Sequence, residues 1–214
     1  MLTALTIKDF FGRMAAEPPP GGGSAAALAG LMGVSLMKMA AQVSGKHFPE
    51  QTGRLAAGQC ELDKLHATFL RLIDEDAQVL AEVLPVLSRP DADREPGLLK
   101  DAVRQAIEVP LHIARSSLDS LEIAQDLLTL AAEHVIGDLM LGAISCHTAL
   151  SGALLMIALN LPLLQEDSLQ AHFSSQAAAL KSAGDQVLAG MQQAVYQKQA
   201  YQLLDVNQKT AYGS

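Results

Sequence analysis

The chain has 214 residues and a formal net charge of -8, and half of its residues are hydrophobic while only 4% are aromatic. The acidic balance argues against nucleic acid as a partner, because binding a phosphate backbone requires clustered Lys and Arg. No change in composition marks a boundary, so we expect one domain over residues 1–214. Its core must consist mainly of Ala, Leu, Val, Met and Gly.

The location expected from the sequence is the cytoplasm. Cys60 and Cys146 lie far apart without a CxxC pair, which indicates reduced thiols, and we expect both in the core. Lys8 and Asp9 stand where a signal peptide needs an apolar stretch, so secretion is not expected.

The first predicted helix follows Thr6, which can cap its start, with Asp9 in the first turn. Pro18, Pro19 and Pro20 must end it.

A glycine loop, Gly21 to Gly23, then leads into a predicted helix over residues 25–43, with Ser24 as its N-cap. Ala26, Gly30 and Gly33 recur three or four residues apart, which gives this helix a flat face for another backbone.

A third helix is predicted from Pro49 to Leu84, with one position of its apolar stripe every seven residues. These positions are Leu55, Leu62, Phe69, Asp76 and Val83. Asp76 is the exception, because a carboxyl group takes a place that its neighbours give to apolar side chains.

The second half also reads as helices. Residues 85–96 read as a loop, and a helix from Leu98 should kink or restart at Pro110. A further run covers residues 117–134, Gly137 and Asp138 break and recap the chain, and a last helix runs over residues 167–204. We find no alternating strand pattern, so we expect an all-α bundle of long helices with a closely packed Ala/Gly-rich core.

Residues 139–164 contain no Asp, Glu, Lys or Arg and are long enough to cross a membrane. We expect no membrane partner, because the segment contains His147 and Asn160 and lacks flanking basic anchors. A helix buried on all sides by other helices has the same composition.

Asp76 can be interpreted in two ways that the spacing favours equally. Asp74 and Glu75 are rotated away by about 160° and 100° on an α-helix, so only Asp76 faces inward. A carboxyl group desolvated there could serve as general acid and base near neutral pH. Alternatively, it pairs with an Arg or caps a neighbouring helix.

For the other candidate functional residues, spacing alone favours a structural role. The glycine loop could bind an anion at a helix N-terminus, but a tight turn into a packed helix is favoured. The position of Asp138 favours a role as helix N-cap, and that of His147 favours a hydrogen-bonded core residue. The six histidines show no metal-binding spacing, so no metal is expected.

The run from Pro20 to Gly30, PGGGSAAALAG, resembles the signature of the formiminotransferase-cyclodeaminase C-terminal domain family. Further similar elements follow in the family's order over most of the chain. They are Gly45-Lys46, Leu72 to Ala77, Leu84-Pro85, Arg94, residues 104–111, Asp138 and Asn160-Leu161.

This resemblance implies an all-α homodimer that acts on a tetrahydrofolate derivative and needs no further cofactor. It implies Asp76 as the catalytic acid and base. It also implies substrate-binding residues, which would be Gly21, Gly22, Gly23, Ser24, Lys46, Arg94, Asp138 and Asn160.

Two activities occur in this family. Cyclodeaminases, which are lyases of one-carbon metabolism, convert 5-formiminotetrahydrofolate into 5,10-methenyltetrahydrofolate and ammonia. Cyclohydrolases open the methenyl bridge with water. One buried carboxyl group could serve either reaction. Cyclodeamination is our first choice, and the sequence does not separate the two.

The chain departs from the family pattern at His47, Leu80, Val86, Gly137 and Met156. The Lys and Asn replaced by Val86 and Met156 would have supplied a charge and hydrogen bonds. A non-catalytic helical dimer that binds folate or a protein is therefore the alternative from another class.

Overall fold

The computed structural model describes the backbone of residues 1–88 and 96–211, and the side chains of residues 1–88 and 100–197. The described residues form six α-helices, of which all but the first are long: α1 (Ile7–Ala16), α2 (Gly22–His47), α3 (Thr52–Leu87), α4 (Pro96–Leu128), α5 (Ile136–Asn160) and α6 (Asp167–Ala211). Short 3₁₀ helices are η1 (Leu2–Ala4), η2 (Pro49–Gln51), η4 (Glu133–Val135) and η5 (Leu161–Leu163). The described residues contain no strand, so the predicted all-α fold is confirmed.

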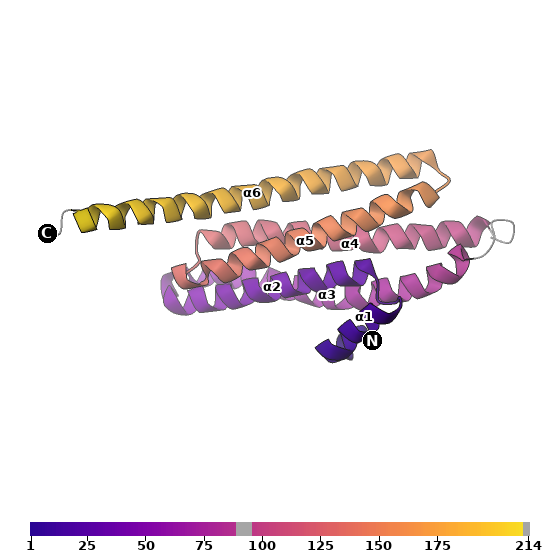
Figure 1. Ribbon diagram of the computed structural model, residues 1–214, viewed down its shortest axis with the longest axis horizontal. Helices are drawn as coiled ribbons and strands as arrows, with labels where there is room; N and C mark the ends of the chain where they lie inside the picture. The colour runs from indigo at the N-terminus through magenta and orange to yellow at the C-terminus, as the bar shows by residue number, and fades with distance from the viewer. Residues whose placement is uncertain (89–95, 212–214) are drawn as a thin grey trace.

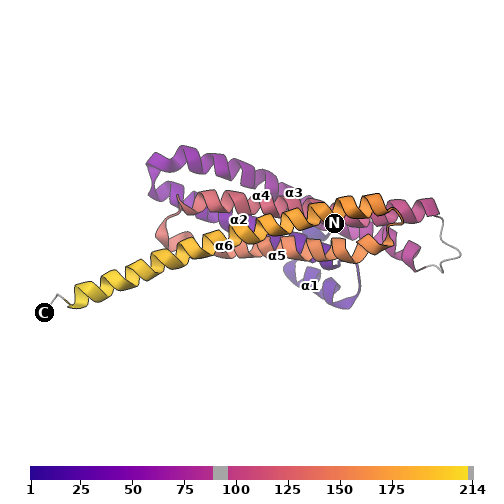
Figure 2. The ribbon, with the colours of Figure 1, turned by 90° about the horizontal axis from the view of Figure 1, so that it is seen from above.

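Helices α2 to α5 form a bundle, with α2 and α5 side by side in front of α3 and α4 in Figure 1. Helix α6 runs along α4 and α5, and its last turns project beyond the end of the bundle (Figures 1 and 2). Helix α1 lies outside the bundle, near the start of α2 (Figure 1).

Helices α2 and α5 approach closely through glycines, as the flat face of α2 predicts. A Cβ atom on Gly33 would lie 2.6 Å from the carbonyl oxygen of Gly142, and one on Gly142 would lie 2.8 Å from that of Gly33. Gly30 meets the Phe69 ring of α3 in the same way, at 2.3 Å. Any larger residue at these positions would push the helices apart.

The apolar stripe of α3 is confirmed by burial. Leu55, Leu62, Phe69 and Val83 are all buried in the bundle. Pro85 does not end α3 as predicted, since the helix continues to Leu87.

Helix α4 neither stops nor restarts at Pro110, contrary to the prediction. Proline lacks an N–H and leaves the carbonyl oxygen four residues earlier, that of Ala106, without its helical donor. The Asn160 side chain supplies the missing donor, because its Nδ2 lies 2.9 Å from the Ala106 oxygen. The following helical run is shorter than predicted and ends at Leu128.

One of three predicted helix caps is confirmed. Thr6 Oγ1 accepts a hydrogen bond from the Asp9 N–H at 3.1 Å and caps α1. The N-cap of α2 is Gly21 and not Ser24, because the helix begins within the glycine loop. Asp138 is likewise not an N-cap, since it lies in the first turn of α5, whose cap is Val135.

Helix α5 is not buried on all sides, which corrects the prediction. Leu141, Leu155 and Leu159 are 51%, 55% and 63% exposed. By length and composition, α2 and residues 133–163 could each cross a membrane, although 50% and 44% of their apolar windows are buried in the bundle. Only one of the two cysteines is a core residue as predicted, because Cys60 is exposed and Cys146 is buried.

Candidate active site

The Asp76 carboxyl group lies against the backbone at the N-terminus of α2. A Cβ atom on Gly23 would lie only 1.9 Å from Asp76 Oδ1, so no side chain fits between them. The N–H groups of the first helical turn have no partner inside the helix and carry its positive dipole end. Asp76 accepts a hydrogen bond from the backbone of Ser24 in this turn, so it caps α2, as the structural interpretation of this residue predicts.

Ser24 is a partner of Asp76. Its Oγ donates a hydrogen bond to Asp76 Oδ2 at 2.7 Å and is 3.3 Å from the carbonyl oxygen of Ile73. Ser24 is fully buried, so it fixes the orientation of the carboxyl group. The other two acids of the motif point elsewhere: Asp74 accepts hydrogen bonds from Leu2 N and Thr3 Oγ1, and Glu75 pairs with Arg71.

Burial raises the pKa of the Asp76 carboxyl group above its ordinary value. Hydrogen bonds from the side chain and backbone of Ser24 act in the opposite direction and lower the pKa by a smaller amount. The shift brings the pKa of Asp76 closer to neutral pH, at which one carboxyl group can both donate and accept a proton.

A small pocket of about 110 Å³ opens above Asp76. Its polar members are Gly22, Gly23, Asp76 and Asn160, and the rest of its lining is apolar. The apolar members are Val79, Leu80, Val83, Leu84, Leu87, Ala106, Pro110 and Met156. No cationic side chain lines it among the described residues.

Asn160 reaches this pocket while tying α5 to α4 through its bond to the Ala106 oxygen. The sequence analysis did not find this contact. Two features of the sequence could have indicated it. A proline at position 110 leaves the carbonyl oxygen four residues earlier unpaired, and Asn160 is a polar residue at the end of an apolar helix.

Lys46 and Asp138 do not join Asp76 within this chain. Lys46 lies 24 residues after Gly22 in the same helix, about 36 Å along its axis at the usual helical rise. Asp138 lies in the first turn of α5, whereas Met156, near the other end of α5, contacts Gly22. Arg94 lies outside the described residues.

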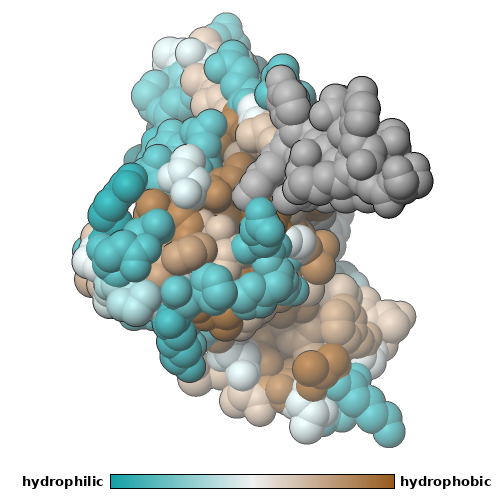
Figure 3. Space-filling view, turned by 90° about the vertical axis from the view of Figure 1, so that its left-hand side faces the viewer, coloured by the Kyte–Doolittle hydropathy of each residue, from teal (hydrophilic) through white to brown (hydrophobic). Residues whose placement is uncertain are grey.

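The Lys46 end of the bundle has a pocket of its own, of about 570 Å³. It is lined by His47, Phe48, Gln51, Thr129, Leu130, Ala131, Glu133 and His134. The His47 and His134 rings meet edge to face, with centroids 5.6 Å apart. Figure 3 looks at this end and shows hydrophilic residues around hydrophobic ones.

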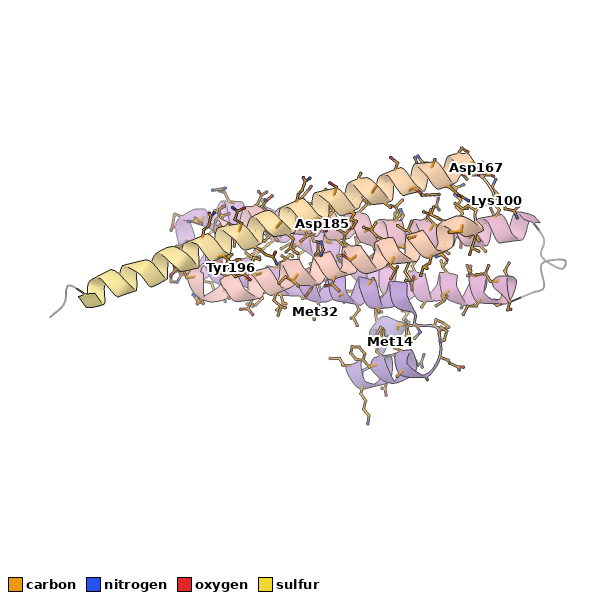
Figure 4. The ribbon with its side chains drawn as sticks, turned by 45° about the horizontal axis from the view of Figure 1, so that its top comes forward. Met14, Met32, Lys100, Asp167, Asp185 and Tyr196 are labelled. Atoms are coloured by element: carbon orange, nitrogen blue, oxygen red, sulfur yellow. The ribbon has the colours of Figure 1, made fainter. Side chains whose placement is uncertain are left out.

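His147, the other candidate from the sequence, forms a structural contact. His147 Nε2 lies 2.7 Å from Asp185 Oδ1 and links α5 to α6, and Asp185 also pairs with Lys181. Figure 4 labels Asp185 on α6. No three His, Cys, Asp or Glu side chains cluster as metal ligands in the described part of the chain.

Two departures from the family pattern lie in the Asp76 pocket. The Leu80 Cδ2 atom would meet a Cβ atom on Gly21 at 2.7 Å, and Met156 Sδ would meet one on Gly22 at 2.9 Å. Val86 is buried, His47 lies at the Lys46 end and Gly137 is exposed. Leu80 and Met156 are thus the departures that can shape what the pocket accepts.

Known proteins share this fold and sequence pattern. The structure resembles that of formiminotetrahydrofolate cyclodeaminase from Thermotoga maritima, with a TM-score of 0.82, 17% identity, and coverage of 92% of this chain and 100% of that chain. Pig formimidoyltransferase-cyclodeaminase is 26% identical over 167 residues, which cover 69% of this chain. The chain matches only 31% of that protein's length.

The sequence profile described as formiminotransferase-cyclodeaminase matches residues 6–179. The match includes the glycine loop, Asp76 and Asn160, and it ends inside α6. The chain therefore belongs to the formiminotransferase-cyclodeaminase family.

Proposed function

We propose that this protein converts 5-formiminotetrahydrofolate into 5,10-methenyltetrahydrofolate and ammonia, with Asp76 as acid and base. The observation that carries the proposal is the Asp76 carboxyl group, which is held between buried Ser24 and the glycine backbone at the floor of an apolar pocket. The folate chemistry rests on membership of the family.

The reaction needs one group that takes a proton and returns it. Attack of the 10-nitrogen on the carbon of the protonated formimino group forms the new C–N bond and turns the C=N bond into a single bond to an amino group, and Asp76 accepts the proton that the 10-nitrogen loses. Asp76 then returns the proton to the amino group on the tetrahedral carbon. The bond to that amino group breaks, ammonia leaves, and the methenyl bridge remains.

The pocket suits the reacting part of this substrate. Its apolar lining from α3, α4 and α5 can hold aromatic rings, and the N–H groups at the start of α2 can donate hydrogen bonds to a carbonyl oxygen. Excluding water around Asp76 also strengthens its electrostatic interactions. Independence from metals and a cytoplasmic location stay predictions.

The direct test follows the near-ultraviolet absorbance of methenyltetrahydrofolate. Purified protein mixed with 5-formiminotetrahydrofolate should raise this absorbance above that of a no-protein control. A protein that instead only accelerates loss of the signal from added methenyltetrahydrofolate is a cyclohydrolase. A folded protein that changes neither signal contradicts both enzymatic assignments.

The variant Asp76→Asn separates catalysis from scaffolding. It keeps the side-chain size but cannot exchange a proton, so kcat should fall by about 10²- to 10⁴-fold while circular dichroism stays unchanged. The matched control is Asp119→Asn on α4, because burial also raises the pKa of Asp119 but its carboxyl group lies outside the pocket. Equal activity of the two variants would refute the role of Asp76.

A further inference from the structure

Two side chains that depart from the family pattern narrow the Asp76 pocket. Leu80 of α3 lies against the backbone of Gly21, and Met156 of α5 lies against that of Gly22. Both line the pocket, whose volume of about 110 Å³ is well below the roughly 300–1,000 Å³ of typical small-molecule sites. The bicyclic ring of a tetrahydrofolate therefore needs one of these side chains to move before it can enter.

Met156 is the side chain that can move most easily. The end of the side chain makes the contact, because Sδ and Cε would lie 2.9 Å and 3.2 Å from a Cβ atom on Gly22, and Cγ would lie 3.9 Å from it. Methionine is unbranched and has more rotatable bonds than leucine, so it adapts to different surroundings. Met156 is only half-buried and Gly22 is exposed, so solvent reaches this contact from one side. The end of Met156 can thus turn outward while its Cβ stays packed.

Met156 lies over backbone donors that a substrate would use. The N–H groups in the first turn of α2 have no acceptor within the helix, and Asp76 accepts the one from Ser24. Those of Gly22 and Gly23 are left for a ligand. The thioether sulfur of Met156 is only a weak acceptor, so it does not replace a carbonyl oxygen there. A substrate that places a carbonyl oxygen at these donors has to displace Met156 from Gly22.

The family pattern has an asparagine where this chain has Met156. An asparagine side chain ends one atom earlier, and its amide group can form hydrogen bonds with a ligand. Methionine extends further and offers no donor. A residue that could bind the ligand is thus replaced in this chain by one that occupies the space of the ligand.

We propose that Met156 determines how tightly the Asp76 pocket binds its substrate. In the free protein it covers Gly22 and closes the pocket, and it turns outward when the ring of the substrate binds over Asp76. The apparent affinity is then reduced by the fraction of molecules in which the pocket is open. The identity of the substrate rests on the proposed function, whereas the closure of the pocket by Met156 does not.

Binding tests the proposal first. The probe is 5-formyltetrahydrofolate, a stable analogue that carries a formyl group in place of the formimino group, and calorimetry measures its affinity. Met156→Ala should bind it about 5- to 20-fold more tightly than the wild type, because no side chain has to move. The matched control is Met14→Ala, which removes another half-buried methionine, on α1 outside the bundle (Figure 4), and should bind like the wild type. Equal or weaker binding by Met156→Ala overturns the proposal.

Two further variants separate occupied space from hydrogen bonding. Met156→Asn shortens the side chain and should tighten binding about as much as Met156→Ala. Met156→Leu keeps a large side chain that is branched and less mobile, so it should bind no more tightly than the wild type. If Met156→Asn alone tightens binding, this position acts through a hydrogen bond and the proposal is wrong.

Steady-state kinetics distinguish this role from a merely structural one. With 5-formiminotetrahydrofolate, Met156→Ala should lower KM by the same factor as the dissociation constant of the analogue. Its kcat should stay within about twofold of the wild type, because Asp76 and Ser24 are unchanged. A lower kcat with an unchanged KM would show that Met156 supports the catalytic geometry and does not limit substrate entry.

A titration without any ligand tests the closure itself. Carboxyl-carbon NMR follows Asp76, whose signal is identified by its loss in Asp76→Asn. Removing Met156 should admit water, so the pKa of Asp76 should be lower in Met156→Ala than in the wild type and unchanged in Met14→Ala. An unchanged pKa in Met156→Ala overturns the closed pocket. A wild type that neither binds nor converts a folate overturns the proposed function, while this titration still decides whether Met156 closes the pocket.

Discussion

The two ends of α2 are built differently. At the N-terminal end, Gly22 and Gly23 leave no room for a methyl group beside Met156 and Asp76. At the C-terminal end, a Cβ atom on Gly45 would meet only Leu55, at an ordinary 3.7 Å, and the adjacent pocket is about 570 Å³. The Asp76 carboxyl group is thus fixed by contact with the backbone, whereas the basic end of the helix is open.

Replacing one glycine by alanine at each end of α2 tests this difference in packing most directly. Gly23→Ala must displace the Asp76 carboxyl group, so it should cost about 1–3 kcal/mol of unfolding free energy and most of the activity. Gly45→Ala should stabilise by about 0.5–1 kcal/mol, since it improves helix propensity and meets no close atom. Urea unfolding of both variants measures the two changes. Similar midpoints for them would remove the contrast between the ends.

The packing at the N-terminal end of α2 also depends on the hydrogen bond that links α4 to α5. Asn160→Leu should cost about 1–3 kcal/mol, because the Ala106 carbonyl oxygen loses its donor. In a Pro110→Ala background a backbone N–H can take over, so the same change should cost less by about 1 kcal/mol. A double-mutant cycle from urea unfolding gives this coupling. Additive costs would mean that Asn160 does not compensate for the proline.

The smallest expected effect is on the pH dependence of stability. The pKa of Asp76 is raised in the folded state, so the unfolded chain loses this proton first as pH rises. Stability from this group is therefore full below the unfolded pKa and falls as pH rises through the higher folded pKa. Urea unfolding at a series of pH values should show this loss in the wild type and not in Asp76→Asn. Identical profiles would contradict it.

The sequence predicted the parts of the fold that depend on periodicity. The seven-residue stripe of α3 identified its buried face and singled out Asp76. The small residues of α2 predicted the close approach of another backbone, which in the structure is that of α5. Both patterns reflect side-chain size and direction on one helix, which a sequence states directly.

Features that depend on a second helix were not predicted. Ser24 has the chemistry of an N-cap, but Asp76 from α3 offers its hydroxyl a buried acceptor. Pro110 reads as a break, but Asn160 from α5 repairs the helix. Hydropathy identified α5 as apolar without showing that part of its surface stays uncovered, because the composition of a helix is the same whether its apolar residues are buried or exposed.

One separation could have been calculated in advance. A continuous helix from the glycine loop to Lys46 already implies about 36 Å between them, so a single chain could not place both on one small substrate group. The family resemblance groups residues by role, whereas helix geometry decides whether they can meet.

Helix α2 has a buried face and an exposed face along its whole length, so the number of residues in it is constrained. One residue inserted near its middle would rotate every later position by about 100°. Met39 and Val43 would then take the places of the buried residues Ala40 and Ser44, and Lys38 and Gln42 would take the places of Met39 and Val43. We therefore expect substitutions to accumulate in α2 among relatives of this chain, while insertions and deletions are confined to the segments between helices.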